Sequence, residues 1–149
     1  LRIFDSWSGS VGANWQIYKD FNIFGNFSTA FETPATIELT NNPFGLGGLN
    51  NSLKPRYSFS YETGLKGQVS SLLSYETSVF LIRAKDEILP FEISKFPGRR
   101  FYSNSGDSER VGIEAALSYR IWNNLNLQLS YTYSNFEFFR YLREGKDNF

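Results

Sequence analysis

Residues 53–83 alternate strictly between two kinds of side chain, and this pattern restricts the fold more than any other feature of the chain. Aromatic, aliphatic and Thr residues take the odd positions, whereas small, polar or charged residues take most of the even positions. A period of two is the signature of a β-strand, because successive side chains of a strand point to opposite faces. The alternation breaks at residues 67–71, so we expect one long hairpin. Its apolar face carries Tyr57, Phe59, Tyr61, Thr63 and Leu65, then Leu73, Tyr75, Thr77, Val79 and Leu81.

The same alternation predicts a second hairpin before this one and a third after it. In chain order, the six expected strands are residues 7–18, 21–32, 57–66, 73–83, 109–120 and 125–134. Short turns are expected at 19–20, 67–71 and 121–124, and long loops rich in Gly, Pro or polar residues at 33–53, at 86–107 and from 137 onward. The prediction is therefore an all-β, antiparallel up-and-down meander in which short turns alternate with long loops.

Composition supports a β protein and excludes several kinds of chemistry. Aromatic residues make up 18% of the chain and favour both strands and membrane interfaces. Fifteen basic and fifteen acidic residues give a formal net charge of zero, so no electrostatic footprint for nucleic acid is visible. The chain has no Cys and no His, which excludes disulfides and Ser-His-Asp or Cys-His catalysis in this stretch. We expect no enzyme activity and no cofactor.

Two architectures fit the alternation, a membrane barrel with its apolar face toward lipid and a soluble barrel that binds a small apolar ligand inside. The strands have about the 9 to 11 residues that a tilted strand needs to cross a bilayer. The polar face is rich in Gly and Ser, smaller than a face solvated by Lys and Glu would be. The apolar face carries aromatic residues near the strand ends and aliphatic ones in the middle, as in the girdles of outer-membrane barrels. These features favour the membrane barrel.

Five stretches, taken in order, resemble the barrel of a TonB-dependent outer-membrane receptor of the siderophore-receptor type. The most recognisable resemblance is LKPRYSFSYETGLKG, in which Leu-Lys-Pro leads into a Tyr-Glu-x-Gly-x-Lys strand. Arg56 departs from the family, which commonly has Glu after the Pro, and this change concerns a local loop contact rather than the fold. The other four stretches are FGNFSTAFETPATIEL at 24–39, SVFLIRAKDEILP at 78–90, FYSNSGDSERVGIE at 101–114 and LNLQLSYTYSNFEF at 125–138.

The resemblance implies that residues 1–149 are part of a larger barrel in the bacterial outer membrane. Receptors of this family have an N-terminal plug, which carries the segment that contacts TonB, and a barrel of about 22 strands. The chain, which lacks Met even at position 1, is expected to be a late-middle piece of that barrel, with about two hairpins after it. The expected partners are outer-membrane lipid, a ferric siderophore or a similar scarce ligand, and TonB through the plug alone. An adhesin or porin shares the alternation but not the ordered motifs.

Two groups of residues are the candidate sites. On the polar face, a lumen wall of ionic side chains is favoured over a glycosidase-like carboxylate pair. Its members are Glu62, Lys66, Glu76, Glu114 and Arg120. In the second long loop, cations and an aromatic ring could attract an anionic ferric siderophore by charge and stacking, although solvation or contact with lipopolysaccharide phosphate would need the same residue types. These extracellular candidates are Lys95, Arg99, Arg100 and Tyr102.

Overall fold

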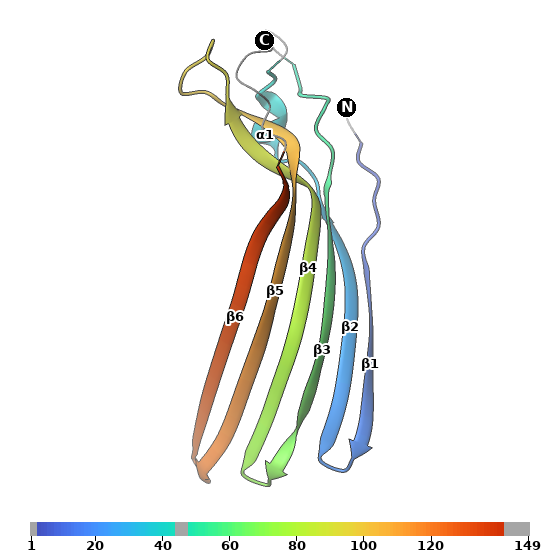
Figure 1. Cartoon of the computed structure of the whole chain (residues 1–149), viewed down its shortest axis with the longest axis vertical. Coiled ribbons are helices and arrows are strands. Elements are labelled where there is room, and N and C mark those ends of the chain that lie inside the picture. Colours follow the sequence, from blue (N-terminus) through green and yellow to red (C-terminus); the bar gives the residue numbers. More distant parts are fainter. Residues whose placement is uncertain (1–2, 44–47, 142–149) are drawn as a thin grey trace.

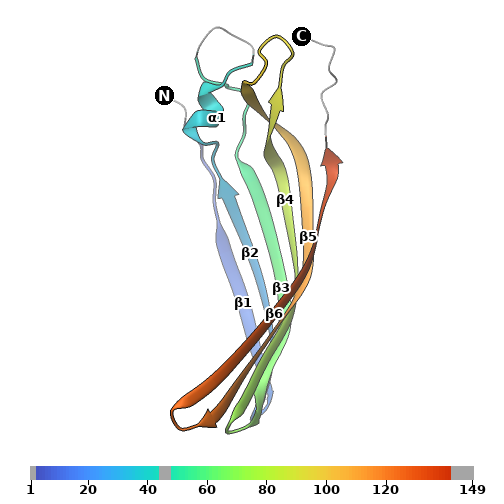
Figure 2. The same ribbon diagram turned by 90° about the vertical axis from the view of Figure 1, so that its left-hand side faces the viewer.

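The computed structural model describes residues 3–43 and 48–141, which form one sheet of six antiparallel strands (Figure 1). Neighbours in the sheet are also neighbours in the chain, so the predicted up-and-down meander is confirmed. The three tight turns lie at one end of the sheet, whereas the longer connections and helix α1 (Thr36–Thr40) lie at the other (Figure 2). The strands are β1 (Gly9–Tyr18), β2 (Phe21–Glu32), β3 (Arg56–Ser70), β4 (Leu73–Glu92), β5 (Arg100–Trp122) and β6 (Leu125–Tyr141).

The strand register extends the two-sided pattern across the whole sheet. One row of paired residues reads Val11, Phe27, Tyr61, Leu81 and Val111, and the next such row reads Ala13, Gly25, Thr63, Val79 and Ile113. We call the face that carries these rows the outer face. The opposite face, which we call the inner face, carries the intervening rows, for example Gln16, Asn22, Lys66, Glu76 and Ala116.

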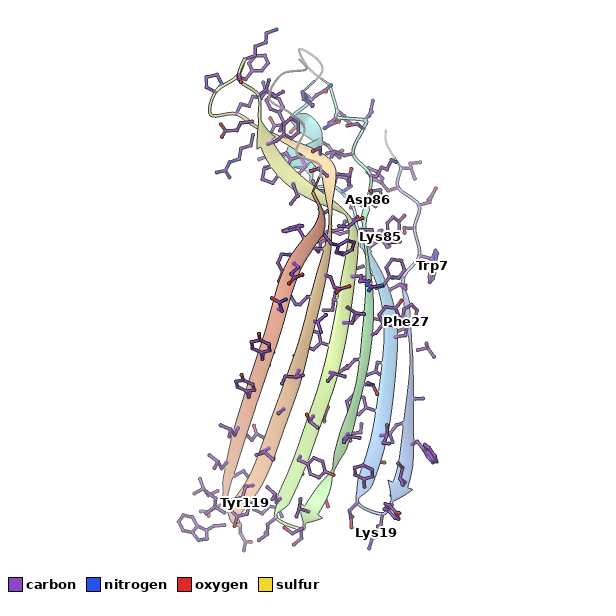
Figure 3. The ribbon with its side chains drawn as sticks, viewed as in Figure 1. Trp7, Lys19, Phe27, Lys85, Asp86 and Tyr119 are labelled. Carbon is purple, nitrogen blue, oxygen red and sulfur yellow. The ribbon has the colours of Figure 1, made fainter. Side chains whose placement is uncertain are left out.

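Aromatic residues lie on the outer face toward both ends of the strands. Trp15, Tyr18 and Trp122 expose 70%, 73% and 67% of their surface, far more than aromatic residues in the core of a soluble protein. Toward the long connections, Phe31 and Tyr57 are direct partners in one outer row and Phe59 lies in the next. Tyr119 lies near the tight turns (Figure 3). This distribution is that of aromatic girdles on either side of a lipid-facing band. Within the described residues, no helix is long and apolar enough to span a membrane.

Most predicted boundaries are close, and the turns are tighter than expected. The turn at Lys19 and Asp20 is confirmed. Strand β3 continues to Ser70, so the break expected at 67–71 shrinks to Ser71 and Leu72. The alternation fails there because a register shift after Gln68 places an extra residue in β3.

The prediction of a long loop at 86–107 is wrong. Strands β4 and β5 continue past the rest of the sheet as a two-stranded extension, and only residues 93–99 connect them. Register shifts at 84–88 interrupt the alternation, and Asp86 adopts a left-handed backbone conformation with φ of 58°. Pro90 is tolerated in β4 because the pairing of β3 with β4 ends at Tyr57 and Lys85, which leaves that side of β4 free of a strand partner.

The two other long connections differ less from expectation. The segment 33–53 contains no strand in its described residues, but it includes helix α1, whose first turn is closed by the Glu38 carboxylate accepting a hydrogen bond from the Ala35 N–H at 2.7 Å. Strand β6 runs to Tyr141, so residues 137–141 belong to a strand and not to the expected loop. Residues 142–149, also assigned to that loop, lie outside the described residues.

Glycines on the inner face make room for aromatic rings from the neighbouring strand. Phe24 lies across Gly64, where a Cβ atom would approach its Cζ to 2.6 Å, and Phe80 lies across Gly112, where the corresponding distance is 2.4 Å. In both pairs the ring and the glycine are direct cross-strand partners. The rings thus cover backbone that a glycine leaves open, an arrangement that pins strand register.

Candidate functional site: the inner wall and the mouth

The five residues predicted to face the lumen all lie on the inner face. Glu62 accepts a hydrogen bond from the Asn26 amide at 3.2 Å, and the Lys66 ammonium lies 5.2 Å from the centre of the Phe24 ring. Lys66 is paired in register with Glu76, but among the described residues no ion pair joins them. Lys66 and Glu76 therefore contribute separate charges to this part of the inner face.

The remaining three members of this wall line two hollows. Glu76 and Glu114 border one of about 110 Å³, with Ser130 and Thr132 beside them. Arg120 borders one of about 190 Å³ near the tight turns, together with Gln68, Ser74 and Gln128. Both hollows present hydroxyl, amide and charged groups to the inner side of the sheet, as expected where a barrel interior holds water.

At the other end of the inner face, Arg56 connects three strands. Its guanidinium forms ion pairs with Glu87 of β4, at 3.0 Å, and with Glu32 of β2. Ser108, which is buried, donates a hydrogen bond from its hydroxyl to Glu87 at 2.7 Å. Burial by itself lowers the pKa of Arg56, but the hydrogen bonds and charges of Glu87 and Glu32 outweigh it and raise that pKa, so the group stays charged. This network ties the upper ends of β2, β3 and β4 together.

The segment between β2 and β3 is fastened to the β4–β5 extension. The Asn104 side chain accepts a hydrogen bond from the Lys54 N–H at 2.7 Å and donates to the carbonyl groups of Lys54 and Asp86 at 2.9 and 2.7 Å. Asn50 donates to the Tyr102 carbonyl at 3.2 Å. Leu53 and Asn50 are almost completely buried, at 0% and 1% exposure. At this end of the sheet, the segment between β2 and β3 thus packs against the β4–β5 extension as one unit. We call this region the mouth.

The four predicted ligand-binding residues all lie on or beside the connection between β4 and β5. Lys95 and Arg99 belong to it, whereas Arg100 and Tyr102 are in β5 rather than in the expected loop. The Lys95 ammonium lies 5.8 Å from the Phe96 ring, and the Arg99 guanidinium lies 5.2 Å from the ring of the buried Phe101. Arg100 is paired in register with Glu92.

Tyr102 lies apart from the three cations and borders a hollow that none of them lines. It borders a space of about 270 Å³ between the two connections, which Lys54, Asp86 and Ser103 also line. The four residues therefore form two clusters, a cation–aromatic group at the tip and a polar hollow below it.

A second cation–aromatic cluster on the inner face was not predicted. Arg110 lies 5.4 Å from the centre of the Phe136 ring, and Phe136 and Phe138 meet edge to face at 5.0 Å. Arg110 and Phe136 are direct cross-strand partners. Extending the alternation of β6 beyond Ser134 would have placed both Phe residues on the inner face. Among the described residues, no group of three or more His, Asp or Glu is placed to hold a metal ion.

The family of the chain is shown by comparison with known proteins. The family model for the TonB dependent receptor-like β-barrel matches residues 2–148. The chain belongs to this family. Barrels of the TonB-dependent receptor family are bacterial outer-membrane proteins.

Three solved structures share the fold. The copper transporter OprC is 20% identical with a TM-score of 0.65, over 85% of this chain and 20% of its own length. The FrpB iron transporter from Neisseria meningitidis is 18% identical with a TM-score of 0.65, over 90% and 20%. The FpvAI–pyocin S2 complex contains a chain that is 18% identical with a TM-score of 0.67, over 87% and 17%. The chain thus spans a fifth or less of the proteins it resembles.

Proposed function

We propose that the complete protein is an outer-membrane receptor that imports a scarce ligand, a ferric siderophore, in a TonB-dependent manner. The observation that carries this proposal is the two-faced wall of a TonB-dependent receptor barrel, with an apolar band on one face and polar groups on the other. A barrel interior lined with small and polar side chains leaves room for a plug and for a ligand to pass it.

The tip of the β4–β5 connection supports an anionic, ring-bearing ligand. Lys95, Arg99 and Arg100 bring three positive charges to a short stretch of chain, and all three residues are exposed. Two of these cations already lie over aromatic rings, which shows that the local geometry suits cation–π contact. Charge would attract an anionic ferric siderophore with planar chelating groups, and stacking would retain it.

Energy coupling is assigned to a part of the protein beyond this segment. Residues 1–149 supply part of one barrel domain, and TonB would act through a plug elsewhere in the protein, within a barrel of about 22 strands. In this scheme the inner-face residues Glu62, Lys66, Glu76, Glu114 and Arg120 line the passage and contact the plug or water.

A transport assay tests the proposal. The complete receptor is produced in a bacterium that lacks its own siderophore receptors, and uptake of iron-55 from a panel of ferric siderophores is measured with and without a functional TonB protein. Uptake of at least one chelate that disappears without TonB is expected. Absence of uptake for every chelate, with the receptor present and folded in the outer membrane, would refute the choice of ligand.

Variants then test whether the cations of the β4–β5 connection bind the ligand. The triple variant Lys95→Ala, Arg99→Ala and Arg100→Ala is expected to weaken binding of the transported chelate about tenfold or more, because each lost cation removes a charge contact worth roughly 0.5 to 1 kcal/mol at an exposed site. Lys19→Ala, at the opposite end of the sheet, is the matched control and is expected to leave binding unchanged. Unchanged affinity of the triple variant would remove these residues from the site.

A further inference from the structure

The hollow of about 270 Å³ beside Tyr102 has a lining that attraction of a siderophore to the tip does not explain. We call it the mouth hollow. Around it, the segment between β2 and β3 contributes Lys54, β4 contributes Asp86 and Phe91, and β5 contributes Tyr102 and Asn104. In Figure 3, Asp86 lies at the end of the sheet that carries the long connections. None of the three cations at the tip lines this space.

Two opposite charges border the mouth hollow without a partner. In the part of the chain that the structure describes, the Lys54 ammonium and the Asp86 carboxylate form no ion pair or hydrogen bond, either with each other or with another residue. Arg56, at the same end of the sheet, is instead paired with Glu87 at 3.0 Å. An unpaired cation and an unpaired anion on one small hollow fit a ligand that carries both charges.

One side chain fixes the spacing of these two residues. The Asn104 amide nitrogen donates to the Lys54 carbonyl at 2.9 Å and to the Asp86 carbonyl at 2.7 Å, so both backbones are held on the same group. Asp86 also donates from its N–H to the Asp107 carboxylate at 3.2 Å, and its φ of 58° is in the left-handed region. Such conformations are sparsely populated and cluster at ligand sites. The two charges are thus carried by a floor that is ordered without a ligand.

Aromatic rings give the mouth hollow an apolar side. Phe91 and Tyr102 both line it, and the Phe91 ring packs 6.0 Å from the ring of Phe101, which is 1% exposed. The volume is slightly below the range of about 300 to 1,000 Å³ that holds drug-sized ligands. The space therefore suits one small molecule that has an apolar ring as well as two charges.

We propose that the mouth hollow binds a free α-amino acid with an aromatic side chain. The carboxylate of the amino acid would bind the Lys54 ammonium, its ammonium would bind the Asp86 carboxylate, and its ring would lie against Phe91 and Tyr102. Charge-assisted hydrogen bonds would hold both ends of the ligand. A neutral sugar could stack on the rings but would leave both charges without a partner, so the zwitterion is favoured. In outer-membrane barrels the long connections face the cell exterior, where free amino acids can reach them.

Calorimetric titration of the complete receptor in detergent with L-phenylalanine tests this site. Two analogues separate the charges, because phenethylamine lacks the carboxylate and hydrocinnamate lacks the ammonium. L-Phenylalanine is expected to bind about tenfold more tightly than either analogue, since each analogue loses one charge-assisted hydrogen bond. Saturable binding with this order of affinities is the expected result.

Variants assign each charge of the ligand to one residue. Lys54→Met removes the cation at similar length and is expected to abolish the preference for L-phenylalanine over phenethylamine. Asp86→Asn removes the anion but keeps a residue that tolerates the left-handed backbone, and it is expected to abolish the preference over hydrocinnamate. Each variant should weaken L-phenylalanine binding about tenfold. The matched controls Lys19→Met and Asp20→Asn, in the turn between β1 and β2, should leave binding unchanged.

Three results would overturn the proposal. The first is the absence of saturable L-phenylalanine binding at millimolar concentration. The second is an unchanged preference over both analogues in Lys54→Met and Asp86→Asn, with folding verified by the heat-dependent shift of intact barrels in gel electrophoresis. The third is tighter binding of a neutral sugar, methyl glucoside, than of L-phenylalanine. The comparison of analogues needs no variant, so it decides the matter even if a variant fails to fold. Iron uptake is not part of the readout, so failure here leaves the transport proposal intact.

Discussion

At the scale of single residues, the packing of the sheet depends on its glycines as much as on its larger side chains. Gly64 and Gly112 accept the rings of Phe24 and Phe80, whereas Gly25 faces open space on the outer face. Identical residues thus have opposite roles, and only the position of the neighbouring ring distinguishes them. Asn104 also matters as a single residue, because its side-chain amide joins the segment between β2 and β3 to the β4–β5 extension through three hydrogen bonds.

Substituting the two kinds of glycine by Ala tests this distinction. Gly64→Ala places a Cβ atom 2.4 Å from the Thr77 carbonyl oxygen, so backbone must shift, and we expect a loss of roughly 1 to 3 kcal/mol. Gly25→Ala is the control and is expected to change stability by less than about 0.5 kcal/mol. Urea unfolding of the complete receptor in detergent or lipid measures both. Equal midpoints would show that the Thr77 backbone and the Phe24 ring both move aside at no cost.

The role of Asn104 is tested by Asn104→Asp, which keeps the acceptor for the Lys54 N–H but removes both donated bonds. We expect faster hydrogen exchange at residues 50–55, by roughly tenfold or more, because an unsatisfied carbonyl costs about 1 to 3 kcal/mol. Asn14→Asp, an exposed amide on β1, is expected to leave exchange in that segment unchanged. Similar exchange in wild type and Asn104→Asp would mean that the buried Leu53 and the Asn50–Tyr102 hydrogen bond hold the segment in place without Asn104.

At the scale of elements, the upper part of the wall is held by partners of unequal strength. Arg56 contacts Glu87, whose side chain is 13% exposed, and Glu32, whose side chain is 67% exposed. Water screens the second pair more than the first, so Glu87 dominates. A Glu at position 56, which the resemblance to the family leads one to expect, would gather three carboxylates in this chain. The carboxylates of Glu87 and Glu32 therefore suit the positive charge of Arg56 in this structure.

Replacing Glu87 and Glu32 one at a time tests whether their ion pairs with Arg56 differ in strength. Glu87→Ala is expected to destabilise the mouth by about 2 kcal/mol, because it also leaves the buried Ser108 hydroxyl without its acceptor. Glu32→Ala is expected to cost less than about 0.5 kcal/mol. Hydrogen exchange at residues 53–58 of the complete receptor reports the difference. An effect of Glu32→Ala as large as that of Glu87→Ala would contradict the assignment.

At the scale of the whole molecule, six strands form part of a wall that is incomplete by itself. Within residues 3–43 and 48–141, strands β1 and β6 each have an edge without a strand partner, and the outer face exposes large apolar residues from Val11 to Tyr133. A lipid bilayer and further strands are the surroundings in which such a surface is stable. The fold is thus a property of the complete barrel in its membrane.

Cysteine scanning along β3 tests the assignment of the two faces. Spin labels at Thr63→Cys and Leu65→Cys are expected to be accessible to oxygen dissolved in lipid, and labels at Glu62→Cys and Lys66→Cys to a water-soluble nickel complex. This segment has no native Cys, so its labelling sites are defined. Electron paramagnetic resonance of the reconstituted receptor measures both accessibilities. The absence of alternation would refute a lipid-facing outer face.

Much of this architecture follows from local sequence. Alternation from Tyr57 to Leu81 determines strands, faces and the position of the tight turns, because the period of side chains along a strand is a property of the backbone. The alternation in three hairpins puts Glu62, Lys66, Glu76, Glu114 and Arg120 on one face, as does the strand register, whereas their position in a lumen stays a prediction. Together with the ordered motifs, the alternation indicated the family. The tertiary structure alone decided the continuation of β4 and β5 beyond Ala84, since bulges and Asp86 disrupt the period there. It also decided which glycine faces a ring and which faces open space, because that depends on pairing between residues far apart in the chain.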